Sequence, residues 1–286
     1  MNDLRVRGHL TALLLVMSVC GVIAQDVTLP ATADSVKFAA IGDNGTGDSL
    51  QYDIANLMTR LHTNFPFDRV IMLGDNVYGS QGPSDLVKKF SQPYKALLDM
   101  GVKFYASIGN HDDPANVKYP LWNMGGERYY TYATKNVRFF ALDSNKVDRK
   151  QLAWLEDALK NAREDWKICY FHHPLYSDGG THGSTVDVRV ILEPLFLTYG
   201  VNVVFSGHDH IYERLTPQKG IYYFVEGASG QLRKGDTKHS AMTAKAFDQD
   251  LSFMLLEIAG NVLSFQAISR GGATVDSGTI QRQVKR

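Results

Sequence analysis

The chain has 286 residues, of which 44% are hydrophobic, and it contains no low-complexity tract. A chain of this size and composition can bury a full hydrophobic core, which excludes a disordered or fibrous protein. Lysine plus arginine and aspartate plus glutamate number 30 each, so the formal net charge is zero. This balance argues against nucleic-acid binding through a broad basic face. Any attraction for an anionic substrate must therefore be local.

The N-terminus has the layout of a cleavable signal peptide. Arg5 and Arg7 precede an apolar run over residues 10–23, and small residues lie at the spacing expected for cleavage. The alternative is an uncleaved anchor, but the run is shorter than the roughly 20 residues needed to cross a bilayer. We expect cleavage after Ala24, no stable membrane insertion, and a secreted, periplasmic or lumenal protein. Cleavage would leave Cys169 as the only cysteine, which excludes an intrachain disulfide.

Short apolar runs rich in β-formers alternate with amphipathic stretches, a rhythm typical of stacked β-α-β units. The expected strands are 36–41, 69–73, 103–108, 137–142, 166–171, 201–205, 221–225, 253–258 and 262–268, and the expected helices lie near 50–61, 85–100, 149–162 and 186–197. The later strands lack long helices between them. The pattern predicts an α/β sandwich with mixed sheets. No Pro/Gly/Ser-rich linker divides the chain, so residues 25–286 are expected to form a single catalytic domain.

Polar side chains follow five of the predicted strands directly. They are Asp43, Asp75, Asn110, His172 and His208. The carboxyl end of the strands is where α/β sheets bind ligands, so these side chains are candidates for one site. A Gly-Asp pair after a strand is by itself an ordinary turn with an Asx hydrogen bond. Its occurrence after two successive strands favours a functional site.

Two of the motifs contain histidines. The sequence GHDH at 207–210 places two imidazoles at i and i+2, which in an extended segment point the same way and can reach neighbouring metal ions. The sequence GNHD at 109–112 offers an amide oxygen to a metal and leaves His111 free for proton transfer, although a polar turn is the bland alternative. In His172-His173-Pro174, only one of the two histidines need be a ligand.

Together with Tyr78 in the sequence GDNVY at 74–78, these motifs resemble those of the calcineurin-like metallophosphoesterases. Within that superfamily they are similar to the purple acid phosphatases of the small, tartrate-resistant type. The resemblance spans roughly residues 36–269. The tyrosine is its diagnostic element, because most of the wider superfamily lacks a tyrosine ligand there. The resemblance implies a four-layer α/β/β/α metallophosphoesterase sandwich with mixed sheets, and a phosphoric monoester hydrolase with acid phosphatase activity.

The resemblance also implies a dinuclear metal centre. Asp43, Tyr78 and His210 would bind Fe(III), Asp75 would bridge, and Asn110, His172 and His208 would complete a site for a divalent ion, namely zinc, Fe(II) or manganese. Phenolate and carboxylate are hard ligands that suit a trivalent ion, whereas imidazoles suit these divalent ions. The two ions bring five positive charges against three from the oxygen ligands. A surplus of positive charge would remain to attract phosphate.

The expected nucleophile is a metal-bound hydroxide, with the ions roughly 3.5–4 Å apart. His111 is the expected residue to contact phosphate and protonate the leaving oxygen. His182, in the glycine-rich stretch 180–183, is a second catalytic candidate, with a solvent-exposed structural histidine as the alternative. His173 adjoins a proposed ligand and is a candidate for a secondary role.

Two other functions remain as alternatives. One is a phosphodiesterase or nucleotidase of the same superfamily, and the other is a non-catalytic secreted metal-binding protein. The second is disfavoured because no expected ligand or proton donor is missing. The expected partners are small phosphoester substrates or phosphoproteins, and not nucleic acids.

Overall fold

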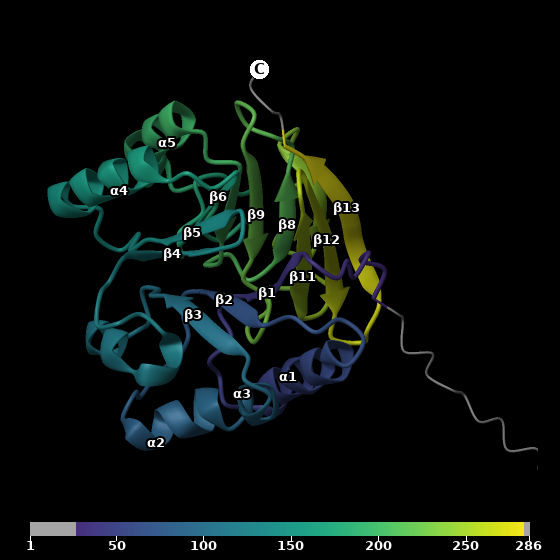
Figure 1. Cartoon of the computed structure of the whole chain (residues 1–286). Coiled ribbons are helices and arrows are strands. Elements are labelled where there is room, and N and C mark those ends of the chain that lie inside the picture. Colours follow the sequence, from purple (N-terminus) through teal and green to yellow (C-terminus); the bar gives the residue numbers. More distant parts are fainter. Residues whose placement is uncertain (1–26, 283–286) are drawn as a thin grey trace, which may run out of the picture.

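The computed structural model describes residues 27–282, so the predicted signal peptide lies outside the described residues. Two β-sheets pack face to face, and helices cover the outer face of each (Figure 1). This is the α/β/β/α order of layers that the resemblance implies. The prediction of a sandwich with mixed sheets is confirmed.

The first sheet has the strand order β13-β12-β11-β1-β2-β3. Its strands are β1 (Val36–Ile41), β2 (Arg69–Leu73), β3 (Lys103–Ser107), β11 (Ser252–Ala259), β12 (Val262–Ser269) and β13 (Thr274–Gln281). β1, β2 and β3 are parallel to one another, whereas β11, β12 and β13 pair antiparallel. The carboxyl ends of the three parallel strands therefore lie at one edge.

The second sheet has the order β10-β8-β9-β7-β6-β5-β4. Its strands are β4 (Tyr130–Thr134), β5 (Val137–Ala141), β6 (Trp166–Tyr170), β7 (Val203–Ser206), β8 (Tyr212–Leu215), β9 (Tyr222–Glu226) and β10 (Thr243–Phe247). β5, β6, β7 and β9 form its parallel centre, and the other three pair antiparallel. This sheet also has a shared carboxyl edge.

The helices are α1 (Ser49–His62), α2 (Pro83–Leu86), α3 (Lys95–Asp99), α4 (Arg149–Asn161) and α5 (Val186–Tyr199). Asp48 caps α1 and Asp148 caps α4, each carboxylate accepting two backbone N–H groups of the first turn. α5 ends at Gly200, whose φ of 70° lies in the left-handed region that glycine favours at helix ends.

The prediction of one helix over 85–100 is wrong. The segment is divided into α2, a π-helical turn at Val87–Ser91 and α3. Pro93 has no N–H to give to the carbonyl of Lys89, four residues earlier. The side-chain amide of Gln51, on α1, donates to that carbonyl instead, at 2.7 Å. The break is therefore stabilised by a contact between two helices.

Three clusters of buried hydrophobic side chains fill the spaces between the four layers. The first joins α1 to the outer face of the first sheet, and the third joins α4 and α5 to the outer face of the second. The middle cluster lies between the sheets, where the rings of Phe38 and Phe139 meet edge to face at 5.3 Å. Tyr130 and Tyr132 pack against this cluster.

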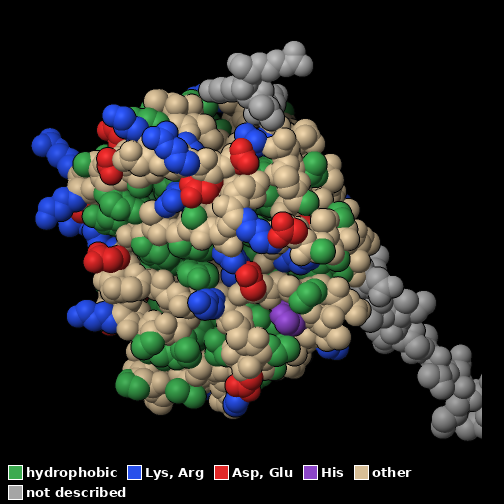
Figure 2. Space-filling view, in the orientation of Figure 1, with side chains coloured by type: hydrophobic (Ala, Val, Ile, Leu, Met, Phe, Trp, Pro, Cys, Tyr) green, Lys and Arg blue, Asp and Glu red, His purple; other side chains and the backbone are tan. Residues whose placement is uncertain are grey.

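Between residues 27 and 282, no helix is both long and apolar enough to cross a membrane. On the face that Figure 2 shows, lysine and arginine side chains are interspersed with aspartate and glutamate rather than gathered into one patch. This mixture agrees with the balanced charge of the sequence.

Candidate metal centre

The loops after β1, β2, β3, β6 and β7 bring the predicted ligands together, because these parallel strands end at the facing carboxyl edges of the two sheets. Their exposure is graded. Asp43, Asp75 and His172 are buried, Tyr78, His208 and His210 are half-buried, and Asn110 is exposed. The candidate centre thus has a buried floor and one side open to solvent.

Three of these residues have a left-handed backbone. The φ angles are 52° at Asp43, 50° at Asp75 and 71° at His208. Such conformations cost on the order of 1–3 kcal/mol for a non-glycine residue and cluster at functional sites. A Cβ at Gly109 would overlap the Asp75 carboxylate, and a Cβ at Gly207 would overlap that of Asp43. The strand ends are therefore built to admit these two carboxylates.

The predicted Fe(III) ligands present three donor atoms to one another. The Tyr78 Oη donates to Asp43 Oδ1 at 2.9 Å and lies 3.2 Å from His210 Nε2. The His210 Nε2 is 3.3 Å from the same Asp43 oxygen. Donor atoms bound at about 2.0–2.2 Å to one ion lie about 3 Å apart when they occupy neighbouring octahedral positions. The group fits a single hard cation.

The predicted ligands of the divalent ion form a second group around His172. Its Nε2 lies 3.0 Å from Asn110 Oδ1, 3.1 Å from His208 Nδ1 and 3.4 Å from Asp75 Oδ1. Ligand atoms of Asp43, Asp75 and His172 all lie within 4.8 Å of one another, so the two groups adjoin. Asp75 lies between them, as a bridging ligand would.

The tautomer of His172 tests whether this second group fits a metal. Its Nδ1 lies 2.9 Å from the carbonyl oxygen of Leu73, which can only accept, so Nδ1 carries the proton. Nε2 then turns its lone pair toward the oxygens of Asn110 and Asp75, which are acceptors too. These three acceptor atoms repel one another, and a cation between them, or a proton on His208 Nδ1 at 3.1 Å from Nε2, relieves that repulsion. A histidine held in this way is the usual arrangement of a metal ligand.

The pKa shifts of these side chains also suit a metal site. Burial, followed by repulsion from Asp75, raises the pKa of Asp43 well above its usual range, and burial raises the pKa of Tyr78. Burial lowers the pKa of His208 to about 2 and that of His210 to about 4. The imidazoles thus stay neutral and able to coordinate in acid, while Asp43 and Tyr78 require a nearby cation to ionise.

Both predicted catalytic histidines lie at the open side. His111 is exposed, its ring is 4.9 Å from that of Tyr78, and its backbone N–H donates to Asp75 Oδ1 at 2.9 Å. His182 is also exposed and stacks on His208 with ring centroids 4.1 Å apart. They flank the opening over the two donor groups.

Two carboxylates that the sequence did not identify hold the loop of His182. Ser177 donates to Asp209 at 2.6 Å, and the hydroxyl of Thr181 donates to Asp236 at 2.9 Å. Asp209 lies between two predicted ligands, yet its side chain turns to this loop. The loop therefore has firm supports, which its glycine-rich sequence did not suggest.

Asp112 is a further residue whose role the sequence did not reveal. Its carboxylate accepts the backbone N–H groups of Gly109 at 2.8 Å, Asn76 at 3.1 Å and Val77 at 3.0 Å, and the side-chain amide of Asn76 at 2.8 Å. It thereby joins the loop after β2 to the loop after β3. The only signal in the sequence was an acid following Asn110 and His111.

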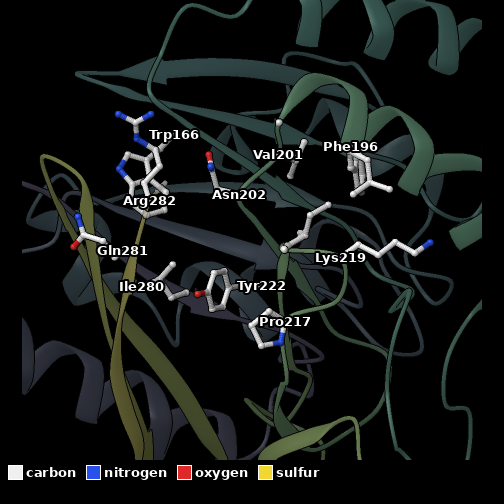
Figure 3. Close-up of a pocket in the computed structure, with 14 residues that line it drawn as sticks. Trp166, Phe196, Val201, Asn202, Pro217, Lys219, Tyr222, Ile280, Gln281 and Arg282 are labelled. Carbon is white, nitrogen blue, oxygen red and sulfur yellow. The ribbon is translucent and has the colours of Figure 1, made fainter. Parts of the chain in front are cut away.

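A cavity of about 420 Å³ opens at the opposite end of the second sheet. Trp166 at the start of β6, Asn202 just before β7 and Tyr222 at the start of β9 line it (Figure 3). These are the amino ends of the strands, whereas the predicted ligands follow the carboxyl ends. None of the predicted ligands or catalytic histidines lines this cavity, so its lining does not contribute to the candidate centre.

Known proteins are similar to this chain in sequence. Residues 36–212 match the family model described as calcineurin-like phosphoesterase. Tartrate-resistant acid phosphatase type 5 of Homo sapiens is 26% identical over 92% of this chain and 97% of its own length.

Solved structures show the same fold. GAP50, the anchor in the inner membrane complex of Plasmodium, has a TM-score of 0.75 at 19% identity, covering 88% of this chain and 90% of its own. A purple acid phosphatase from yellow lupin (Lupinus luteus) seeds has a TM-score of 0.72 at 18% identity, covering 89% of this chain and 55% of its own. At these identities the likeness concerns the fold alone. Since the family model spans more than half of the sequence, the chain belongs to the calcineurin-like phosphoesterase family.

Proposed function

We propose that the chain is an acid phosphatase that hydrolyses phosphomonoesters at a dinuclear centre of Fe(III) and a divalent ion, namely zinc, Fe(II) or manganese. The observation that carries the proposal is the meeting of Tyr78, Asp43 and His210 within 3.3 Å, beside a second donor group around His172. A phenol in that position favours a ferric ion. The similarity to tartrate-resistant acid phosphatase supports the choice of reaction.

The proposed ligands divide between the two ions. Asp43, Tyr78 and His210 would hold Fe(III), Asn110, His172 and His208 would hold the divalent ion, and Asp75 would bind both. When bound, the ions would supply an activated water and neutralise charge during in-line displacement at phosphorus. The buried floor of the site keeps Asp43, Asp75 and His172 out of bulk water, and the open side admits the phosphoester.

We assign different roles to the two exposed histidines. His111 is fixed through its backbone to Asp75 and would give a proton to the leaving oxygen. Burial and then the positive charge of Arg233 lower the pKa of His182, which favours its neutral form. A neutral imidazole is a weak proton source but a good hydrogen-bond partner, so His182 would orient the phosphoryl group.

Replacing His111 with asparagine should lower kcat by about 100-fold or more on an alkyl phosphate, because an alkoxide must be protonated as it leaves. The loss should be much smaller on 4-nitrophenyl phosphate, whose leaving group needs no proton. Steady-state kinetics on both substrates measures the difference. His239→Asn, at an exposed position, is the control. Equal losses on the two substrates would contradict the assignment.

Replacing Tyr78 with phenylalanine should abolish the visible tyrosinate-to-iron absorption of the iron-loaded protein, since the phenolate oxygen is removed. Absorption spectra should be recorded together with the iron content per chain. Tyr129→Phe is a matched control, because Tyr129 packs on Trp154 and belongs to neither donor group. Retention of the colour in Tyr78→Phe would refute a ferric ion at this position.

We further propose that residues 25–286 act as one catalytic domain of a secreted, periplasmic or lumenal protein, with small phosphoesters or phosphoproteins as substrates. Hydrolysis of 4-nitrophenyl phosphate and of bis(4-nitrophenyl) phosphate across pH tests the reaction class. Monoester preference with an acidic optimum supports the proposal. Diester preference would favour a phosphodiesterase, and a fully metallated protein without turnover would favour a non-catalytic metal-binding protein.

A further inference from the structure

Arg233 lies beside the candidate metal centre although it belongs to no recognised motif. The segment 227–233 follows β9 and runs along the ligand loops. The backbone N–H of Gln231 donates to the carbonyl of Asp43 at 3.1 Å, and that of Arg233 donates to the carbonyl of His210 at 3.0 Å. Two proposed Fe(III) ligands thus fix the path of this segment and place Arg233 next to them.

The guanidinium of Arg233 has no partner within residues 27–282. Its Nη1 is buried without a hydrogen bond, and no described carboxylate forms an ion pair with it. Two other half-buried arginines are paired with carboxylates, Arg214 with Asp276 and Arg138 with Glu164, each at 2.7 Å. A buried charged donor without an acceptor is strongly unfavourable. An anion from outside the chain would supply the missing acceptor.

The charge of Arg233 acts at the mouth of the site. It lowers the pKa of both His182 and His210, second only to burial in each case. One of these residues is at the exposed rim and the other is a proposed ligand. Arg233 is itself half-exposed, so an anion arriving through the mouth can reach it.

We propose that Arg233 binds a second anionic group of the substrate, carried by the leaving group beside the phosphoryl that reacts. The inference rests on the proposed phosphatase function and names its substrate class. The expected substrates are nucleoside diphosphates and other compounds with a second phosphate close to the scissile bond. Arg233 belongs to neither ligand group but adjoins His210 through its backbone, so we place its anion beside the reacting phosphoryl. A guanidinium can hold such a phosphate through two parallel hydrogen bonds.

With a nucleoside diphosphate the reaction is hydrolysis of the phosphoanhydride bond. A bond forms between the water oxygen and the terminal phosphorus, and the bond from that phosphorus to the bridging oxygen breaks. The bridging oxygen receives a proton from His111, and the attacking water releases one. The products are orthophosphate and a nucleoside monophosphate, which retains the phosphate bound at Arg233.

The test compares AMP, which has one phosphate and a neutral leaving group, with ADP, on the mature chain loaded with iron and zinc. Arg233→Gln should raise KM for ADP by about 10- to 100-fold, the effect of losing a charge-assisted hydrogen bond, and change kcat/KM for AMP less than about twofold. Arg233→Lys should keep part of the ADP affinity. Lys234→Gln removes an adjacent, exposed charge and should affect neither nucleotide.

Calorimetry supplies a readout that does not depend on turnover. The protein should bind methylenediphosphonate more tightly than methylphosphonate, and Arg233→Gln should abolish this difference. Equal losses on AMP and ADP, or an unchanged preference for the diphosphonate, would overturn the proposal. Failure of the wild-type chain to hydrolyse 4-nitrophenyl phosphate would refute the proposed function instead, and the phosphonate titrations would still decide the role of Arg233.

Discussion

Replacing Asp75 with asparagine should reduce kcat/KM for a phosphomonoester by more than about 100-fold. The Asp75 Oδ1 lies 3.4 Å from His172 Nε2 and accepts the backbone N–H of His111 at 2.9 Å, so one oxygen adjoins both a proposed ligand and the proposed proton donor. Asparagine keeps the shape of the side chain but removes its charge. Mutation of a residue that only hydrogen-bonds to a metal ligand typically lowers metal affinity or activity 10- to 100-fold. Loss of a bridging ligand should lower them more.

The measurement is the rate on 4-nitrophenyl phosphate together with the metal content per chain and the far-ultraviolet circular dichroism spectrum. Asp99→Asn is the matched control, because Asp99 is exposed and, among residues 27–282, pairs only with Lys95. A folded Asp75→Asn protein with full activity and two metal ions per chain would rule out the bridging role.

Replacing Asp112 with alanine should lower the free energy of unfolding by about 3–5 kcal/mol, near the upper end for one substitution. The change removes a buried acceptor of three backbone N–H groups in two loops, whereas the side-chain amide of Asn76 keeps the carbonyl of Ser107. Burial raises the pKa of Asp112 to about 7, but alanine removes the acceptor whichever form is present. Urea denaturation of the wild-type and variant chains gives the difference.

The neighbouring Asp113 provides a control in the same loop. It is exposed, and its carboxylate accepts the N–H of Ala115 at the start of a short helical turn. Asp113→Ala should therefore cost less than about 1 kcal/mol. If the two alanine variants were equally stable, the loops would not depend on the Asp112 carboxylate.

Buried elements were predictable because their apolar runs are continuous. The expected strand at 36–41 coincides with β1, and the expected helix near 50–61 is α1 within one residue at each end. The strands that the sequence did not reveal include β4, β10 and β13, which lie at sheet edges. An edge strand buries less of its surface, so its alternation of apolar and polar residues is weak. In β13 only Ile280 is fully buried.

Five of the seven predicted ligands could be found because they closely follow strands, and the rule that ligands lie at the carboxyl edge unites them. Of the other two, Tyr78 came from the family resemblance and His210 from its spacing to His208. Arg233 could not be found in this way. It lies seven residues beyond the end of β9 and reaches His210 only because β9 pairs with β7 in the folded sheet. Asp209 lies within a histidine motif, but only the fold shows that it holds the loop of His182.

The left-handed backbone at Asp43, Asp75 and His208 limits how the metal preference of this chain could be redesigned. A library at these positions should be restricted to asparagine, aspartate, histidine and glycine, which tolerate positive φ, and should omit β-branched residues. Tyr78 and Asn110 are not under this restriction, because neither has a positive φ. Variation for a new metal is best concentrated there, where the side chain can change without breaking the turn that carries it.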